Sequence, residues 1–202
     1  MNKIAIFYHL GQINNWEEIF DEQMNLLINS RLIDYAEFVH VGINGDIEPK
    51  FYHKKIKYVY NDERDWYLQE GNTMKSLLFF ADKNPNYNIL FFHSKGVTKP
   101  DEENVKNWRQ MSDHYCIDHW EECIELLKSC DAVGINRREL PRLHFSGTYW
   151  WSTSQYIKTL SHEMLWADDS YGREFYIGSK NGNLQSIHDS GIDSHYLTPV
   201  SY

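Results

Sequence analysis

The segment His93-Ser94-Lys95-Gly96 carries residue types that suit phosphate binding. It begins at the end of the apolar stretch NILFFHS, which predicts a central strand. Lys95 is a point charge suited to a phosphate group, Ser94 is a hydrogen-bond donor, and Gly96 allows the backbone to approach a ligand closely. The Gly-x4-Gly-Lys-Ser/Thr spacing of the P-loop is absent. A turn with a solvated lysine is the alternative interpretation.

A second segment, LHFSGTYWW, combines two adjacent indoles with a small turn. Each Trp has a large apolar area and an N–H that needs a partner, and Gly147 permits a sharp turn. This combination suits a flat, hydroxyl-rich ligand such as a sugar. Trp150 and Trp151 would shape the pocket, with His144 and Ser146 as polar contacts. The alternative is that the two Trp side chains alternate across a core strand.

Charged residues elsewhere extend these candidate sites. Arg109 could contact a phosphate or pair with Asp113 four residues later on a helix. The pairs Asp168-Asp169 and Arg173-Glu174 supply carboxylates for a general base, which must lie within hydrogen-bond reach of the hydroxyl that it activates. Asp168 and Asp169 could instead complement the dipole of a helix N-terminus.

Histidines near the end of the sequence provide potential metal ligands. His188 and His195 flank Asp189 and Asp193, a set that a metal could use. A hydrolase that binds a metal through His93, His188 and His195 is therefore one alternative, although HExxH and comparable spacings are absent. Ordinary polar roles for these histidines are the other.

The hydrophobic pattern indicates an α/β fold, because predicted strands alternate with predicted helices through most of the chain. The expected strands are Lys3 to Leu10, Glu37 to Ile43, Lys55 to Tyr60, Asn88 to Ser94 and Asp131 to Asn136. The expected helices are Glu17 to Ser30, Asn72 to Ala81 and one long helix from Val105 to Leu127. We expect one Rossmann-type domain over residues 1–202, with a mainly parallel central sheet flanked by helices. Its ligand would bind beyond the carboxyl ends of the strands.

Composition narrows the possible partners. The net charge of −9 argues against general binding of nucleic acid. The aromatic content of 15% would serve stacking on a sugar or a nucleobase. The sequence contains no apolar run of transmembrane length and no signal-peptide pattern, so we expect a cytoplasmic protein.

Three blocks in a fixed order carry a family resemblance. They are GNTMKSL before NILFFHSKGV, then NWRQM with WEECIELLKSCDAVGIN, and then HFSGTYWW followed by GREFYIG. This order resembles small single-domain GT-A-type glycosyltransferases of bacterial polysaccharide clusters and large DNA viruses. The resemblance covers about Phe7 to Gly178.

The resemblance implies roles for individual residues. The loop from His9 to Asn15, which includes Gly11, and the turn from Gly42 to Gly45 would hold the nucleotide base and ribose. Thr73 and Lys75 would lie near the donor. Glu174 would be the catalytic base of an inverting enzyme, with Asp169 as the second candidate. His195 or His188 would touch a metal or the diphosphate.

The function that follows is a glycosyltransferase that moves a sugar from a nucleotide-diphosphate sugar to a hydroxyl of a glycan or lipid-linked acceptor. A lipid-linked acceptor would place the protein at the inner membrane face. The segment containing Lys95 replaces the Asp-x-Asp motif that usually binds Mn²⁺ or Mg²⁺, so Lys95 would stabilise the leaving group and metal dependence is doubtful. The alternative is a non-catalytic carbohydrate- or nucleotide-binding α/β module.

Overall fold

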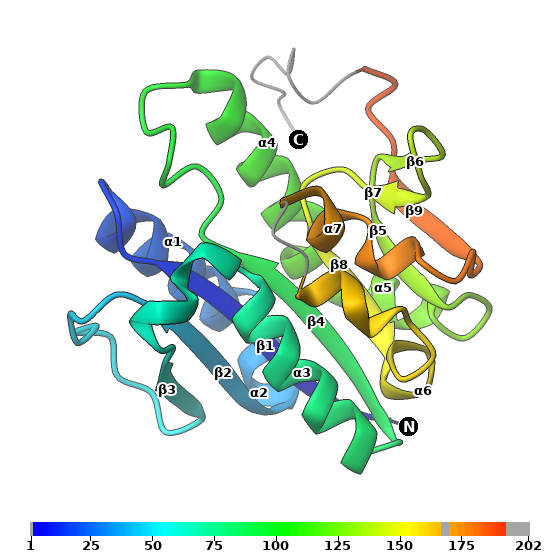
Figure 1. Cartoon of the computed structure of the whole chain (residues 1–202), viewed down its shortest axis with the longest axis horizontal. Coiled ribbons are helices and arrows are strands. Elements are labelled where there is room, and N and C mark those ends of the chain that lie inside the picture. Colours follow the sequence, from blue (N-terminus) through cyan, green and yellow to red (C-terminus); the bar gives the residue numbers. More distant parts are fainter. Residues whose placement is uncertain (1, 167–169, 193–202) are drawn as a thin grey trace.

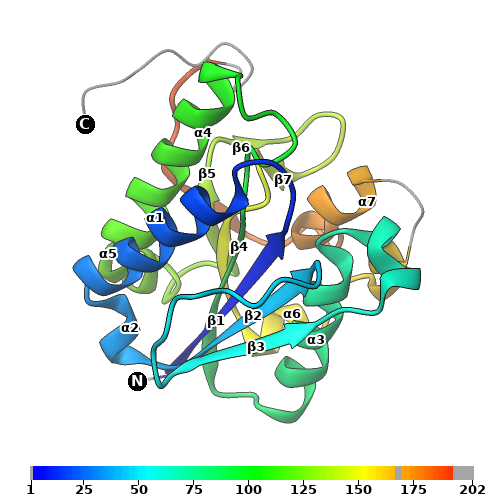
Figure 2. The same ribbon diagram turned by 90° about the vertical axis from the view of Figure 1, so that its left-hand side faces the viewer.

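A computed structural model of the protein describes residues 2–166 and 170–192 (Figure 1). A twisted sheet separates two layers of helices, with α1, α2, α4 and α5 on one face and α3, α6 and α7 on the other (Figure 2). The expected α/β architecture with a mainly parallel central sheet is confirmed. Among the described residues, no helix combines the length and the apolar character needed to cross a bilayer.

Within the described part of the chain, the central sheet has seven strands in the order β3-β2-β1-β4-β8-β5-β9. Its strands are β1 (Lys3–Gly11), β2 (Ala36–Asn44), β3 (Ile56–Tyr60), β4 (Tyr87–His93), β5 (Ala132–Ile135), β8 (Trp150–Thr153) and β9 (Leu184–His188). β8 is antiparallel to both of its neighbours, whereas the other paired strands are parallel. A separate hairpin pairs β6 (Arg137–Arg138) with β7 (His144–Phe145).

The helical elements connect these strands and cover the sheet. The α-helices are α1 (Trp16–Asn29), α2 (Leu32–Tyr35), α3 (Gly71–Lys83), α4 (Glu103–Asp113), α5 (Trp120–Leu126), α6 (Ser154–Ile157) and α7 (Ser170–Glu174). The 3₁₀-helical turns are η1 (Glu63–Leu68), η3 (His162–Leu165) and η4 (Tyr176–Gly178), and η2 (His114–Asp118) is a π-helical turn.

A hydrophobic core fills the space on each side of the sheet, because the inner strands are apolar on both faces. On one side, Tyr8, Phe92 and Trp151 pack with the buried faces of α1, α4 and α5. On the other side, Phe91 and Trp150 pack with α3, α6 and η4. The inner strands therefore have no solvent-facing side, and a ligand can reach them only at their ends.

The single long helix expected from Val105 to Leu127 is wrong. The chain forms α4, a π-helical turn at η2 and then α5. The main-chain carbonyl of Cys116, in this π turn, accepts a hydrogen bond from Trp151 Nε1 at 2.8 Å. This carbonyl is therefore bonded to a core side chain. A π turn is the usual form that such a local interruption takes.

Candidate functional site

A pocket of about 610 Å³ lies at the carboxyl ends of β1, β2 and β4. His9, Asn44 and His93 close these three strands and line the pocket, together with the segment from Ser94 to Lys99. β2 and β4 lie on opposite sides of β1, so the strand order reverses here. Open α/β sheets characteristically bind their ligands at such a point.

The turn after β4 is tied to the end of β1. Ser94 N donates to the carbonyl of His9 at 2.9 Å, and Ser94 Oγ accepts from Gly11 N at 3.1 Å. Gly96 has φ +103°, a conformation that favours glycine, and the chain reverses there. These bonds direct the side chain of Lys95 into the pocket, as expected from the sequence.

The ammonium group of Lys95 lies over the indole of Trp108, 3.4 Å from the ring centroid. Burial lowers the pKa of Lys95 to about 8, although Glu174 and Glu70 act to raise it. The lysine is thus a partly desolvated cation with two carboxylates nearby. An arriving anion would stabilise its protonated form.

The floor of the pocket is a charged group of side chains from three elements. His93 Nδ1 lies 3.4 Å from Glu70 Oε1, and Arg173 Nε lies 3.7 Å from Glu70 Oε2. Burial acts to raise the pKa of Glu70, but His93, His9 and Arg173 outweigh it and hold the pKa below its ordinary value. Burial also lowers the pKa of His93. The floor therefore carries an ionised carboxylate held by Arg173, which is 3% exposed.

His9 occupies the inner wall of this floor. Its Nδ1 is 2.9 Å from Thr73 Oγ1, and its pKa is lowered to about 4 by burial, with Glu70 acting against the shift. Thr73 is fully buried and packs against Gly42, where a Cβ would lie 2.1 Å from Thr73 Oγ1. Thr73 therefore orients His9 and is not itself exposed to the pocket.

The loop before β8 packs against two residues that line the pocket, His93 and Trp108. His93 Nε2 donates to the carbonyl of Gly147 at 3.0 Å, and Gly147 N donates to Glu174 Oε1 at 3.4 Å. Gly147 has φ +96°, and a Cβ there would lie 2.8 Å from Trp108 Nε1. Ser146 takes part through its carbonyl, which accepts from Trp108 Nε1 at 3.4 Å.

A comparison of the sequence with models of protein families assigns the chain to a family. The chain belongs to the family described as "Domain of unknown function (DUF8361)". The profile of that family matches residues 6–185. The sequence has no significant match among curated proteins.

Two solved structures illustrate what the chain is similar to in fold. The 2-C-methyl-D-erythritol 4-phosphate cytidylyltransferase of Francisella tularensis is 13% identical, with a TM-score of 0.53 and coverage of 93% of this chain and 90% of that one. A 4-diphosphocytidyl-2C-methyl-D-erythritol synthase is also 13% identical, with a TM-score of 0.47 and coverage of 98% and 92%. At this identity the first likeness shows the fold alone, which is a Rossmann-like α/β fold.

These structures correct the function drawn from the sequence. The first of them is a cytidylyltransferase and not a glycosyltransferase, so the expected transfer of a sugar from a nucleotide-sugar donor is contradicted. The resemblance in the three sequence blocks is untested by these comparisons and stays a prediction. The expected fold class is the part of that interpretation that the comparison confirms.

The two Trp side chains do not line the pocket, so their predicted role in binding a sugar is wrong. Both are almost fully buried within β8, where Trp150 stacks on Phe91 with ring centroids 5.2 Å apart. Trp151 points to the other face of the sheet and bonds to Cys116 O. Successive side chains of a strand face opposite ways, so the alternation across a core strand is confirmed.

Other predicted contacts also lie away from the pocket. His144 is buried, with its Nδ1 2.7 Å from the carbonyl of Arg142 and its ring against Phe175. The ammonium of Lys75 lies over the Trp166 ring, 5.0 Å from its centroid, because Lys75 faces outward from α3. Neither residue lines the pocket.

Arg109 also has a different position from the one expected. It is 5% exposed and does not line the pocket. Its Nη2 donates to Glu22 Oε2 at 2.9 Å, and its Nη1 donates to the carbonyl of Lys95 at 3.2 Å. The predicted direct contact with a phosphate is therefore wrong, because the guanidinium lies behind the loop.

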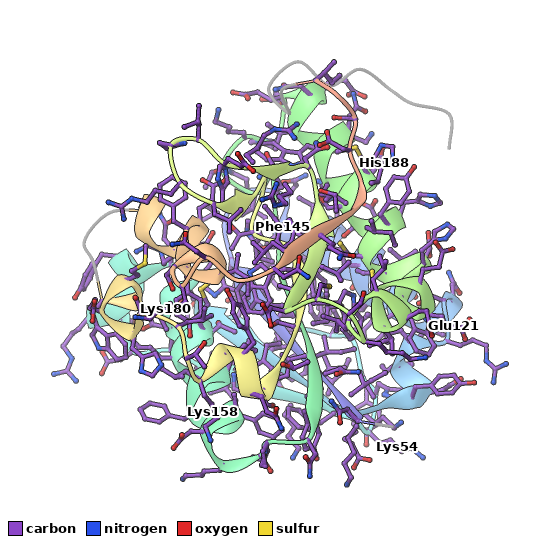
Figure 3. All side chains as sticks on the ribbon, turned by 90° about the vertical axis from the view of Figure 1, so that its right-hand side faces the viewer. Lys54, Glu121, Phe145, Lys158, Lys180 and His188 are labelled. Atoms are coloured by element: carbon purple, nitrogen blue, oxygen red, sulfur yellow. The ribbon has the colours of Figure 1, made fainter. Side chains whose placement is uncertain are left out.

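The expected metal ligands are separated. His188 stacks on Tyr115 with ring centroids 4.1 Å apart, and it lies at the end of β9 (Figure 3). His195 and Asp169 lie outside the described residues. Across residues 2–166 and 170–192, no three His, Cys, Asp or Glu side chains are placed to hold a metal ion.

The sequence assigns no functional role to two residues that line the pocket, Glu70 and Trp108, or to Arg173, which pairs with Glu70. Glu70 closes the turn before α3, Trp108 appeared as one more apolar position of a helix, and Arg173 as the neighbour of a carboxylate. Their relevance depends on the packing of α3, α4 and α7 around the ends of β1 and β4. A Glu directly before a Gly that begins a helix was the one local signal available for Glu70.

Proposed function

We propose that this chain is a nucleotidyltransferase that binds a nucleoside triphosphate in the pocket and transfers the nucleotidyl group to a phosphate of a small acceptor. The observation that supports it is Lys95, a partly desolvated cation at the point of strand reversal. The fold likeness to a cytidylyltransferase supports the same reaction class. The pocket volume of about 610 Å³ is within the range of small-molecule sites.

In this reaction an oxygen of the acceptor phosphate attacks the α-phosphorus of the triphosphate. The new P–O bond forms as the bond to the β-phosphate breaks, and pyrophosphate leaves. Negative charge grows on the leaving oxygen, so a fixed cation close to it lowers the barrier. Lys95 is the residue proposed for this task, with Trp108 beneath its ammonium and Lys99 at the mouth of the pocket.

Mg²⁺ is a natural companion for such a triphosphate. Mg²⁺ is usually held by one or two carboxylates together with substrate phosphates. Asp46 is exposed and lines the pocket, so it would suit this role, whereas Glu70 is engaged by His93 and Arg173. The ion would neutralise charge on the phosphates.

Titration of the protein with CTP, UTP, ATP and GTP, in Mg²⁺ and in EDTA, tests the proposal by calorimetry. We expect binding of at least one triphosphate and a loss of roughly 10- to 100-fold in affinity for Lys95→Ala, because a charge-assisted contact is removed. Lys75→Ala is the matched control and should bind as the unaltered protein does. Pyrophosphate release with a panel of phosphorylated polyols then reports transfer.

Two results would overturn the proposal. Absence of binding to all four triphosphates would remove its basis, and so would an unchanged affinity for Lys95→Ala in a folded protein. Binding without pyrophosphate release from any acceptor would indicate a nucleotide-binding module without catalytic activity.

A further inference from the structure

Arg109 joins three parts of the molecule behind the pocket. It lies on α4, bonds to Glu22 on α1 and donates to the carbonyl of Lys95 in the loop after β4. Glu22 and Asp113 act to raise the pKa of Arg109, although burial opposes them. The guanidinium is therefore charged and nearly buried, and its two hydrogen bonds link Glu22 to the loop. We call this arrangement the brace.

The loop is shaped to receive this brace. A Cβ at Gly96 would lie 3.1 Å from Arg109 Nη1, so the absence of a side chain there lets the guanidinium approach the backbone. A small separate cavity, of about 120 Å³, borders Arg109 and Gly96 together with Lys106. Gly96 borders this cavity and the main pocket, whereas Arg109 borders only the former.

A second buried network holds the loop on its other side. Tyr149 OH donates to the carbonyl of His93 at 2.8 Å, and Gln23 Nε2 donates to Tyr149 OH at 2.7 Å and to Asp113 Oδ1 at 3.0 Å. Burial raises the pKa of Asp113 to about 8. The carbonyls of His93 and Lys95 are thus both fixed from the protein side.

Helix α4 acts on Lys95 from two directions. Trp108 lies under the ammonium group, and the next residue, Arg109, holds the main-chain carbonyl. A side chain with four rotatable bonds reaches one place reproducibly only when its backbone is fixed. The ammonium position therefore depends on both neighbours.

We propose that Arg109 is a positioning residue, which fixes the backbone of Lys95 and so holds its ammonium group in the pocket for an anionic ligand. The proposal deepens the proposed function and rests on it for the identity of the ligand. Arg109 acts through Lys95 and does not touch the ligand. Glu22 completes the brace by holding the second guanidinium nitrogen.

The titration of Lys95 itself provides a test that needs no nucleotide. Lysines are reductively methylated with ¹³C-formaldehyde, and the Lys95 signal is assigned from its loss in Lys95→Arg. In the unaltered protein we expect a titration midpoint well below that of the other lysines, in line with a pKa of about 8. In Arg109→Gln we expect the midpoint to rise by about 1 unit, because the released loop exposes the ammonium to water.

Matched variants separate this effect from general damage. Lys106→Gln removes the same charge from the exposed side of α4 and should leave the midpoint unchanged. Arg109→Lys should restore part of the shift, and Glu22→Gln, at a partly exposed partner, should give a smaller rise in a folded protein. A midpoint in Glu22→Gln and Arg109→Gln equal to that of the unaltered protein would overturn the proposal. So would an ordinary midpoint for Lys95 before any substitution.

CTP titration of the same variants keeps the two proposals apart. Arg109→Gln should weaken binding by about tenfold, less than loss of Lys95 itself. If the Lys95 midpoint shifts but the unaltered protein binds no nucleotide, the proposed function fails while the positioning role stands. If nucleotide binds equally well to Arg109→Gln and to the unaltered protein, the positioning role fails alone.

Discussion

Strands β4 and β8 are hydrogen-bonded neighbours that meet the pocket in opposite ways. Phe91 on β4 pairs with Trp150 on β8, and both strands are buried. β4 runs parallel to β1, so the residues after it reach the pocket. β8 runs antiparallel, so it is the residues before this strand that lie at the same end of the sheet. This brings Gly147, rather than the two Trp side chains, to His93.

The direction of a strand therefore decides which of its flanking residues can take part in chemistry. The segment after β4 has small and charged side chains, and its residues from Ser94 to Lys99 line the pocket. The body of β8 is covered on both faces by helices, so its large side chains have no solvent contact. Residue type alone does not separate these two outcomes, whereas strand direction does.

The largest effect expected from this contrast is on stability at Trp151. Trp151→Ala should lower the free energy of unfolding by about 3–5 kcal/mol, because it leaves a cavity and an unpaired Cys116 carbonyl. Urea denaturation measures the loss. Nucleotide affinity of the folded protein should remain unchanged, unlike that of Lys95→Ala. Trp151→Phe is the milder variant, and a binding defect in it without lost stability would return the indole to the ligand site.

The elements of the first half of the fold follow from local patterns. The expected strands at Lys3 to Leu10, Glu37 to Ile43 and Asn88 to Ser94 each agree with the structure to within about a residue or two at their ends. Apolar runs bounded by turns specify such strands without help from distant contacts. The predicted pocket residues His9, Gly11, His93, Ser94, Lys95 and Gly96 follow from the same rule, because they close those strands.

The remainder of the site depends on contacts between distant segments. Glu70, Trp108 and Arg173 are separated by more than thirty positions in the sequence, and only tertiary packing joins them around Lys95. β9 has few apolar residues, so its own sequence does not predict a strand. Its pairing with β5 stabilises it. Propensity gives little guidance where such a tertiary partner decides the structure.

An intermediate effect is expected at Gly147, where the loop before β8 contacts the pocket residues His93 and Trp108. Gly147→Ala should destabilise the protein by about 1–3 kcal/mol and weaken nucleotide binding, because φ is positive and the new Cβ displaces Trp108 from beneath Lys95. Gly191→Ala is the matched control. Its φ is +71°, but nothing lies within 4 Å of its Cβ, so it should show strain without the binding defect. Equal binding in both variants would contradict this account.

The smallest expected effect is a loss of folding stability at acid pH, caused by the buried His9 at the pocket end of the sheet. Burial lowers the pKa of His9 to about 4 from 6.5, so between these values the unfolded chain binds a proton that the folded protein does not. Stability should therefore fall as the pH decreases from 6.5 toward 4, with His9 contributing on the order of 1–2 kcal/mol at pH 5. His9→Gln should flatten this part of the curve of unfolding free energy against pH.

His40 tests whether that sensitivity is particular to the pocket. Burial also lowers its pKa to about 4, yet it lies on β2 against Phe7 and outside the pocket. His40→Gln should flatten the curve as well, but a bound nucleotide should not alter the contribution of His40. The phosphates of a bound nucleotide should instead raise the pKa of His9 and so reduce the acid-induced loss of stability. If nucleotide leaves the curve of His40→Gln unchanged, the phosphates do not lie near His9, and the pocket must hold its ligand nearer to Lys99.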